Sequence, residues 1–283
     1  MNLLSGLEKF GIKADGDLDI TKNPDQHKDT REGVIKKRPS LEDLTEKDLV
    51  LQKSVQCPIC DHKFKVLAVK SAKAKRIGSD SDTRPHYHNI DILKYDAIVC
   101  PHCGYAAMTK YFEHISATQM RWVKEAVCSK FTPLSDDVPE TYSADEAVDR
   151  YKLALVSAMA KRARTSEKAL ICLRIAWIRR DQIKEIPDHT PEQLRKRQEL
   201  SQEYEGFYRQ AYDGFTQAYS QETGLNNVSI EYILANMAIH FKEYGTASKL
   251  ISQLLGNPNA NPRVKDRCLE LKEKVVKATK SNS

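Results

Sequence analysis

Two short cysteine motifs constrain this chain more than any other feature of its sequence. They read Cys57-Pro-Ile-Cys60 and Cys100-Pro-His-Cys103. A Cys-Pro-x-Cys turn lets two thiolates reach one ion, and two such turns supply the closed tetrahedral shell of a structural zinc site. The pattern therefore predicts one structural Zn²⁺ held by Cys57, Cys60, Cys100 and Cys103. Because sulfur fills all four positions, such a site leaves no position for a catalytic water.

The surroundings of the motifs support this interpretation and add one complication. Gly104 follows the second pair, where a glycine can adopt a positive φ, and Asp61 holds the equivalent place after the first pair. Residues 61–99 separate the motifs, about twice the usual ~15–20 residues. The ribbon must therefore carry an insertion, which costs only ~0.6 kcal/mol per doubling of loop length. Redox-active cysteines and an iron–sulfur cluster are the alternatives to zinc.

Composition limits the cellular setting. The 283-residue chain has no run of the ~18 apolar residues that a membrane span needs, and it has no secretory signal pattern. We therefore expect a cytoplasmic protein, in a reducing compartment where paired cysteines bind metal more often than they form disulfides. The net charge of +6 permits contact with nucleic acid without arguing for it.

The chain divides into three parts, and together they predict an α+β fold. Residues 1–48 form a polar tail or linker that starts with a short helix. Residues 49–114 form the split zinc ribbon, in which the β-forming segments 63–69 and 95–99 predict strands. Residues 115–283 have helical periodicity and form the third part.

Apolar spacing locates several helices in the third part. Ile171, Ile175 and Ile178 widen the apolar face of one helix, which predicts burial on most sides. A long helix is expected from Pro191 to near Gly224, followed by three more. Residues 230–255 resemble a tetratricopeptide repeat, in which small residues let two antiparallel helices approach. Generic antiparallel packing is the alternative. The residues that carry this likeness are Ala235, Ala238, Tyr244, Ala247 and Pro258.

The insertion contains a second group of metal-binding residue types. Residues 80–91 include three aspartates with His86 and His88, which could hold a second metal with an open position, as in an enzyme. The alternative is a polar loop in which the aspartates form turns. We expect the loop, because Pro85 and Asn89 disfavour a regular strand that would place both histidines on one face.

The remaining cysteines, histidines and lysines have simpler interpretations. Cys128, Cys172 and Cys268 lie on helical stripes and are expected to be buried. His62 and His102 lie beside or inside the motifs and are expected to be exposed, since four sulfurs complete the shell. The basic run within residues 63–76 could contact phosphate, but a solvated face is favoured.

The sequence resembles a known family. The segments that carry the likeness are Cys57-Pro-Ile-Cys60, Asp80-Ser-Asp82 and Tyr95-Asp-Ala-Ile-Val-Cys100-Pro-His-Cys-Gly-Tyr-Ala-Ala107. They are similar to the family catalogued as "domain of unknown function 2225", found mainly in Firmicutes, and the likeness runs from Leu49 to the end of the chain. The resemblance implies a split zinc ribbon followed by tetratricopeptide-like helices, and it implies no known activity.

These observations favour a non-enzymatic interaction protein whose helical part offers a groove to a protein or peptide partner. The second hypothesis is a nucleic-acid-binding module that uses the ribbon and its lysines. The third is a metal-dependent enzyme built on residues 80–91.

Overall fold

The structure, a computed structural model, describes residues 43–280. The expected N-terminal helix and most of the polar tail lie outside these residues. The described part has an α+β fold, as predicted, and begins with a 3₁₀ turn at residues 46–49. Its strands are β1 (Val50–Gln56), β2 (Lys63–Val69), β3 (Arg76–Ser79), β4 (Pro85–Tyr87), β5 (Ala97–Val99) and β6 (Ala106–Met108). Its helices are α1 (Ala117–Ala126), α2 (Ala144–Ala160), α3 (Thr165–Glu185), α4 (Pro191–Gln221), α5 (Asn227–His240), α6 (Tyr244–Gly256) and α7 (Pro262–Lys280).

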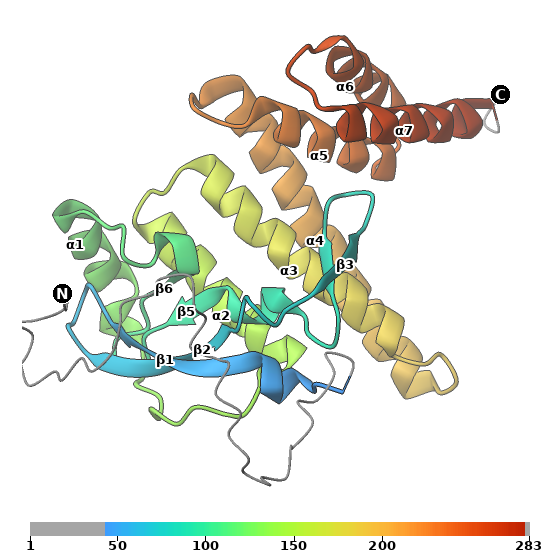
Figure 1. The fold of residues 1–283 in the computed structure, drawn as a ribbon. Coiled ribbons are helices and arrows are strands. Elements are labelled where there is room, and N and C mark those ends of the chain that lie inside the picture. The colour runs from blue at the N-terminus through green and yellow to red at the C-terminus, as the bar shows by residue number, and fades with distance from the viewer. Residues whose placement is uncertain (1–42, 281–283) are drawn as a thin grey trace, which may run out of the picture. The chain divides into compact units, whose positions relative to one another are not determined.

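The strands pair as three antiparallel hairpins, β1–β2, β3–β4 and β5–β6. The first and third hairpins carry the two cysteine motifs in their loops, and the second hairpin is the insertion between them (Figure 1). The predicted strand at residues 63–69 is confirmed as β2. The other predicted strand starts two residues late, at Ala97, because residues 92–95 form a 3₁₀ turn capped by the Asp91 side chain.

One expectation about the insertion is wrong. Residues 85–87 form β4, although Pro85 argued against a regular strand there. The strand is short, and among residues 43–280 its one partner strand is β3, so it lies at the edge of a two-stranded sheet. Its last residue, Tyr87, also makes an isolated bridge to Ile90. An edge strand tolerates proline because one side of the strand has no neighbouring strand, so the N–H that proline lacks can be one that would have faced solvent.

The β5–β6 hairpin is buried on both faces. Ala97, Val99, Ala106 and Met108 belong to the large core formed with the helices, whereas Ile98 and Ala107 belong to the smaller core around the cysteines. Alternate residues of a strand point to opposite faces, which explains this division. Residues on both sides of position 114 therefore share one core.

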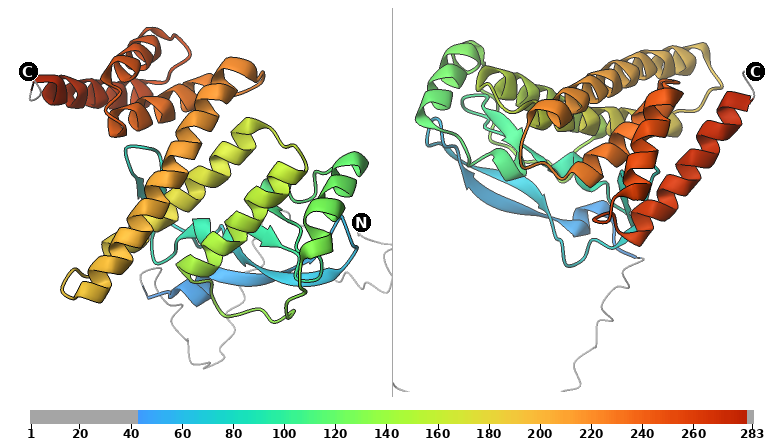
Figure 2. Two further views of the ribbon diagram at one scale, coloured as in Figure 1. Left: turned by 180° about the vertical axis from the view of Figure 1, so that it is seen from behind. Right: turned by 90° about the horizontal axis from the view of Figure 1, so that it is seen from above.

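Helices α3 and α4 form a long pair that lies side by side in both views of Figure 2. Ile171, Ile175 and Ile178 of α3 are buried, as their spacing predicts. The long helix after Pro191 is confirmed as α4, which has a Thr190–Gln193 capping box at its start. Glycine at position 214 lets α4 approach the α3 residue Ala169 closely.

The chain ends in three shorter helices, at the positions that the periodicity predicts. Helices α5 and α6 pack against each other, and α7 packs on both. Ala235, Ala238 and Ala247 are fully buried between these helices, which allows the close approach expected of small residues. Identity with a tetratricopeptide repeat stays a prediction. Within residues 43–280, every helix is too short or too polar to cross a membrane.

Candidate metal centre

Each cysteine motif forms the same tight turn at the tip of its hairpin. In the first, the Asp61 amide donates to the Cys57 carbonyl over 3.0 Å, and the Cys57 amide donates to the His62 carbonyl over 2.9 Å. In the second, Gly104 and Cys100 make the same pair of bonds, each 2.9 Å long. Asp61 has φ 58° and Gly104 has φ 74°, so the predicted left-handed conformation is confirmed at both positions.

The two turns bring the four thiols together. All four Sγ atoms lie within 4.8 Å of one another. Sγ of Cys57 lies 3.6 Å from that of Cys103, and Sγ of Cys60 lies 3.7 Å from that of Cys100. Sulfurs placed ~2.3 Å from a central zinc at the corners of a tetrahedron are ~3.8 Å apart. The arrangement therefore has the size of a four-sulfur metal site and could hold one ion.

The site is shielded from solvent. Cys57 and Cys100 are fully buried and Cys103 nearly so, while Cys60 is half-buried. Their core is completed by aromatic and aliphatic side chains from β2, β5 and α1. The Tyr105 hydroxyl donates to the Phe112 carbonyl over 3.1 Å, which ties the second turn to the segment that enters α1.

Without a metal, the thiols share their protons unequally. Hydrogen bonding to Cys100 raises the pKa of Cys57 to about 12 and also raises the pKa of Cys103. Hydrogen bonds from Cys103 and Cys57 lower the pKa of Cys100. Binding of a cation to four thiolates must release the protons that the thiols hold.

The neighbouring cysteine and histidines depart partly from expectation. Cys172 and Cys268 are buried as predicted, but Cys128 is half-buried beside Cys103 at the end of α1. His102 is exposed, as predicted. His62 is instead half-buried, because its ring stacks on His102 at 5.2 Å and its Nε2 lies 3.0 Å from Asp136.

The insertion uses its aspartates to contact α3. Asp82 is buried. Its carboxylate accepts a 2.7 Å hydrogen bond from Trp177 Nε1 and forms an ion pair with Arg180 over 2.6 Å. Arg180 also pairs with Asp80 over 2.6 Å. Burial acts to raise the pKa of Asp80, but the hydrogen bond from His86 and the charge of Arg180 lower it overall.

A second set of ion pairs extends this contact. Arg84 is buried and reaches Asp91 over 2.9 Å and Asp181 of α3 over 2.7 Å. Within residues 43–280, the four cysteines are the one group of three or more ligand side chains placed to share an ion. The partners on α3 lie about a hundred residues beyond the aspartates, so no local signal in the sequence identified them.

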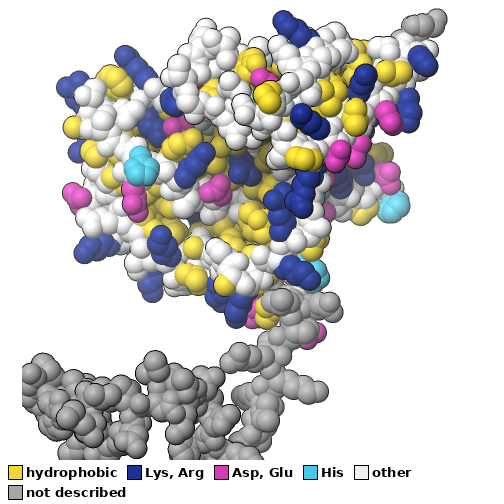
Figure 3. Space-filling view, turned by 45° about the horizontal axis from the view of Figure 1, so that its top comes forward, with side chains coloured by type: hydrophobic (Ala, Val, Ile, Leu, Met, Phe, Trp, Pro, Cys, Tyr) yellow, Lys and Arg dark blue, Asp and Glu magenta, His cyan; other side chains and the backbone are white. Residues whose placement is uncertain are grey.

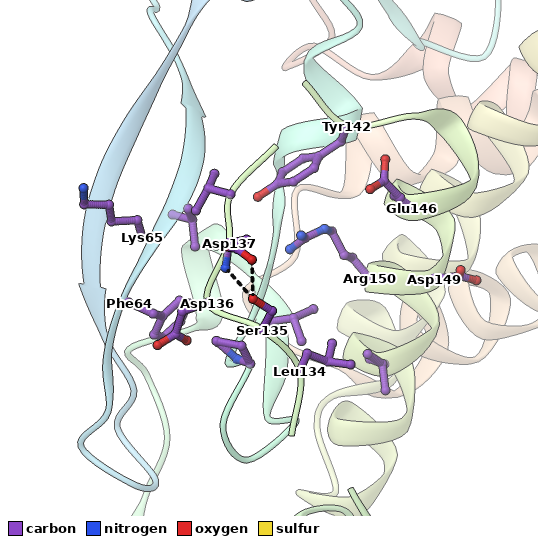
Figure 4. A pocket seen from close by; sticks show the side chains of 15 residues that line it. Phe64, Lys65, Leu134, Ser135, Asp136, Asp137, Tyr142, Glu146, Asp149 and Arg150 are labelled. Carbon is purple, nitrogen blue, oxygen red and sulfur yellow. Dashed lines mark hydrogen bonds between the residues drawn. The ribbon is translucent and has the colours of Figure 1, made fainter. Parts of the chain in front are cut away.

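A small cavity of about 250 Å³ lies beside the second cysteine turn (Figure 4). Tyr142 and Arg150 form one wall, where the guanidinium lies 3.9 Å from the centre of the ring. Phe64 and Lys65 of β2 lie opposite, as the view shows. Several of its polar side chains already have partners: Ser135 donates to Asp137 over 2.6 Å, and Asp136 is paired with His62.

Comparisons with known proteins identify the family but no characterised relative. Searches of the curated proteins and of the solved structures gave no match. A family model matches residues 50–275, which include both cysteine hairpins, the insertion and nearly all of the helices. The resemblance seen in the sequence is confirmed, and the chain belongs to the bacterial family described as "Uncharacterized protein conserved in bacteria (DUF2225)".

Proposed function

We propose that Cys57, Cys60, Cys100 and Cys103 hold one structural Zn²⁺ and that the protein is a non-enzymatic interaction protein. The spacing of the four sulfurs carries the first part, because it matches a tetrahedral zinc–thiolate shell. A closed shell of four sulfurs favours a structural over a catalytic role for the ion.

Metal content tests the zinc assignment. The purified protein is expected to contain about one zinc per chain, and the double variant Cys57→Ser plus Cys100→Ser is expected to contain none. The matched control is Cys268→Ala, which removes a buried thiol from α7, outside the cluster. Undiminished zinc in the double variant, or iron as the dominant metal in the wild type, would refute the assignment.

The helical part supplies the proposed binding surface for a protein or peptide partner. Helix α7 buries Cys268, Leu271 and Val275, yet it also exposes Leu269 by 50% and Val276 by 42%. These two residues are seven apart, so they lie on one face of the helix. The exposed Lys272 and Glu273 lie between them on this face. Two apolar side chains with charges between them form a mixed surface that a partner helix or peptide can cover.

Affinity capture from the bacterium, followed by mass spectrometry, tests this surface. The variant Leu269→Glu plus Val276→Glu is expected to lose the partners that the wild type captures. Leu194→Glu is the control, since Leu194 is exposed by 52% on α4. Capture of the same partners by both variants would rule out the α7 surface.

One observation keeps the nucleic-acid hypothesis as a second candidate. Lys63 and Lys65 are exposed on β2, where they alternate with the buried Phe64. However, Figure 3 shows Lys and Arg side chains scattered over the visible face among acidic and apolar ones. A DNA or RNA mobility shift that weakens steeply with salt would favour this function over the interaction protein.

A further inference from the structure

A larger cavity, of about 590 Å³, is bounded by the hairpins β1–β2 and β3–β4, the segment 92–98 and helix α3. Its volume falls within the ~300–1,000 Å³ that is usual for small-molecule sites, whereas the cavity beside the second cysteine turn is smaller. Thr109, which follows β6, also lines it, so five separate segments of the chain contribute and only the folded protein forms the cavity.

The walls are largely apolar. Strand β2 contributes successive residues near its end, and the segment that leads into β5 contributes the opposite side. The apolar side chains that the argument needs are Val66, Leu67, Val69, Ile92, Tyr95 and Ile98. A surface of this kind favours a ligand with a hydrocarbon or aromatic body.

Arg174 of α3 supplies the most informative polar group of the lining. Its Nε is buried and has no hydrogen-bond partner within the described residues. Arg84 and Arg180 also have an unpartnered Nε, but their other nitrogens form ion pairs with aspartates. For Arg174 the structure records a contact with the Trp177 ring, 5.3 Å from its centre, and a longer-range electrostatic interaction with Asp96. Among residues 43–280 it forms no close ion pair like those of Arg84 and Arg180. A buried guanidinium donor without an acceptor is costly, and a ligand oxygen would satisfy it.

The charges of the lining favour an anion. Lys53, Arg76 and Arg174 bring three positive charges against the single carboxyl of Asp96. Burial raises the pKa of Asp96, although Arg174 and the hydrogen bond with Thr109 act in the opposite direction.

We propose that this cavity binds a small organic anion, with an apolar body against the walls and one carboxylate or phosphate group on Arg174. The site does not depend on which metal the cysteines hold. It gives the chain a ligand-binding capacity separate from the proposed partner surface on α7.

Calorimetric titration of the full-length, metal-loaded protein tests the proposal with three probes of equal chain length. They are octanoate, octyl phosphate and the uncharged 1-octanol. We expect at least one of the two anions to bind at one equivalent per chain, at least tenfold more tightly than 1-octanol. The tighter anion identifies which head group the site prefers.

Three variants locate the binding. Arg174→Gln is expected to remove the tenfold preference for the anion, and Ala74→Trp is expected to abolish binding by filling the cavity. Arg150→Gln, which alters the smaller cavity, is expected to leave binding unchanged. Zinc content and circular dichroism check the fold of each variant, so Ala74→Trp decides if Arg174→Gln does not fold.

Three outcomes would overturn the proposal. They are the absence of saturable binding of either anion at millimolar concentration, equal affinity for octanoate and 1-octanol, and anion binding that survives both cavity variants.

Discussion

At the scale of single residues, the two cysteine turns solve the same backbone problem with different amino acids. Asp61 and Gly104 both adopt a left-handed conformation, which asparagine, aspartate and glycine tolerate best. The two positions differ in what surrounds them. A Cβ atom at position 104 would collide with the ring of Phe131, so only glycine fits there.

This difference predicts the effect of adding one methyl group. Gly104→Ala is expected to lower the free energy of unfolding by about 2–4 kcal/mol, from the left-handed strain and the overlap with Phe131 together. Gly78→Ala, where a Cβ meets no atom within 4 Å, is expected to change it by less than about 0.5 kcal/mol. Denaturant titration measures both, and equal effects would contradict the steric explanation.

At the scale of elements, the β3–β4 hairpin is fastened to helices that lie far away in the sequence. Asp82 and Arg84 carry the contacts with α3, and Arg267 of α7 donates to the Ser79 hydroxyl over 2.8 Å. The charged residues of the insertion therefore serve as an anchor. Two buried ionic contacts on one short hairpin make its position sensitive to the loss of a single carboxylate.

Replacement of that carboxylate tests the anchor. Asp82→Asn is expected to cost about 2–4 kcal/mol of stability, because Arg180 and Trp177 lose a buried carboxylate and Arg180 keeps only its pair with Asp80. It is also expected to change the fluorescence of Trp177, whose indole N–H donates to Asp82. Asp213→Asn is the control, since this exposed residue forms a single pair of 4.0 Å with Arg209. A stability equal to that of the control would show that the ion pair does not hold the hairpin.

At the scale of the whole described unit, the β5–β6 hairpin connects the cysteine core to the helical core. Alternate side chains of its strands belong to the two cores, so a change in structure at the cysteine site can reach α2 through these side chains. The helices α3 to α7 nevertheless bury many residues against one another. We therefore expect their packing to persist when the cysteine site holds no ion.

Removal of the metal should therefore loosen the hairpins around the cysteines. It should also destabilise the helices without unfolding them. Structural zinc contributes ~10–16 kcal/mol of apparent binding free energy in small zinc peptides, so chelation is expected to lower the unfolding temperature. At room temperature we expect most of the helical circular dichroism to persist, while amides of β1 and β2 exchange faster with solvent. The Cys57→Ser plus Cys100→Ser variant is the control and should not respond to the chelator. Loss of nearly all helical signal would show that the helices depend on the metal site.

The sequence by itself determined the features that depend on local spacing. The two Cys-Pro-x-Cys motifs, with Asp61 and Gly104 after them, sufficed to predict two equivalent turns, because turn geometry involves residues only a few positions apart. The apolar period of 3.6 residues likewise located α3, α4 and the three terminal helices. The family followed from the residues around Cys100. Each of these patterns is complete within a short stretch of chain.

Only the tertiary structure decided the features that join distant segments. The role of Asp80 and Asp82 depends on Trp177 and Arg180, and charge alone could not distinguish a metal ligand from an ion-pair partner. Strand β4 formed despite Pro85 because, in the part of the chain that the structure describes, β3 is its one partner strand. The cavity at Arg174 exists because five segments of the chain line it. Such features arise from the register and packing of whole elements, which local periodicity does not specify.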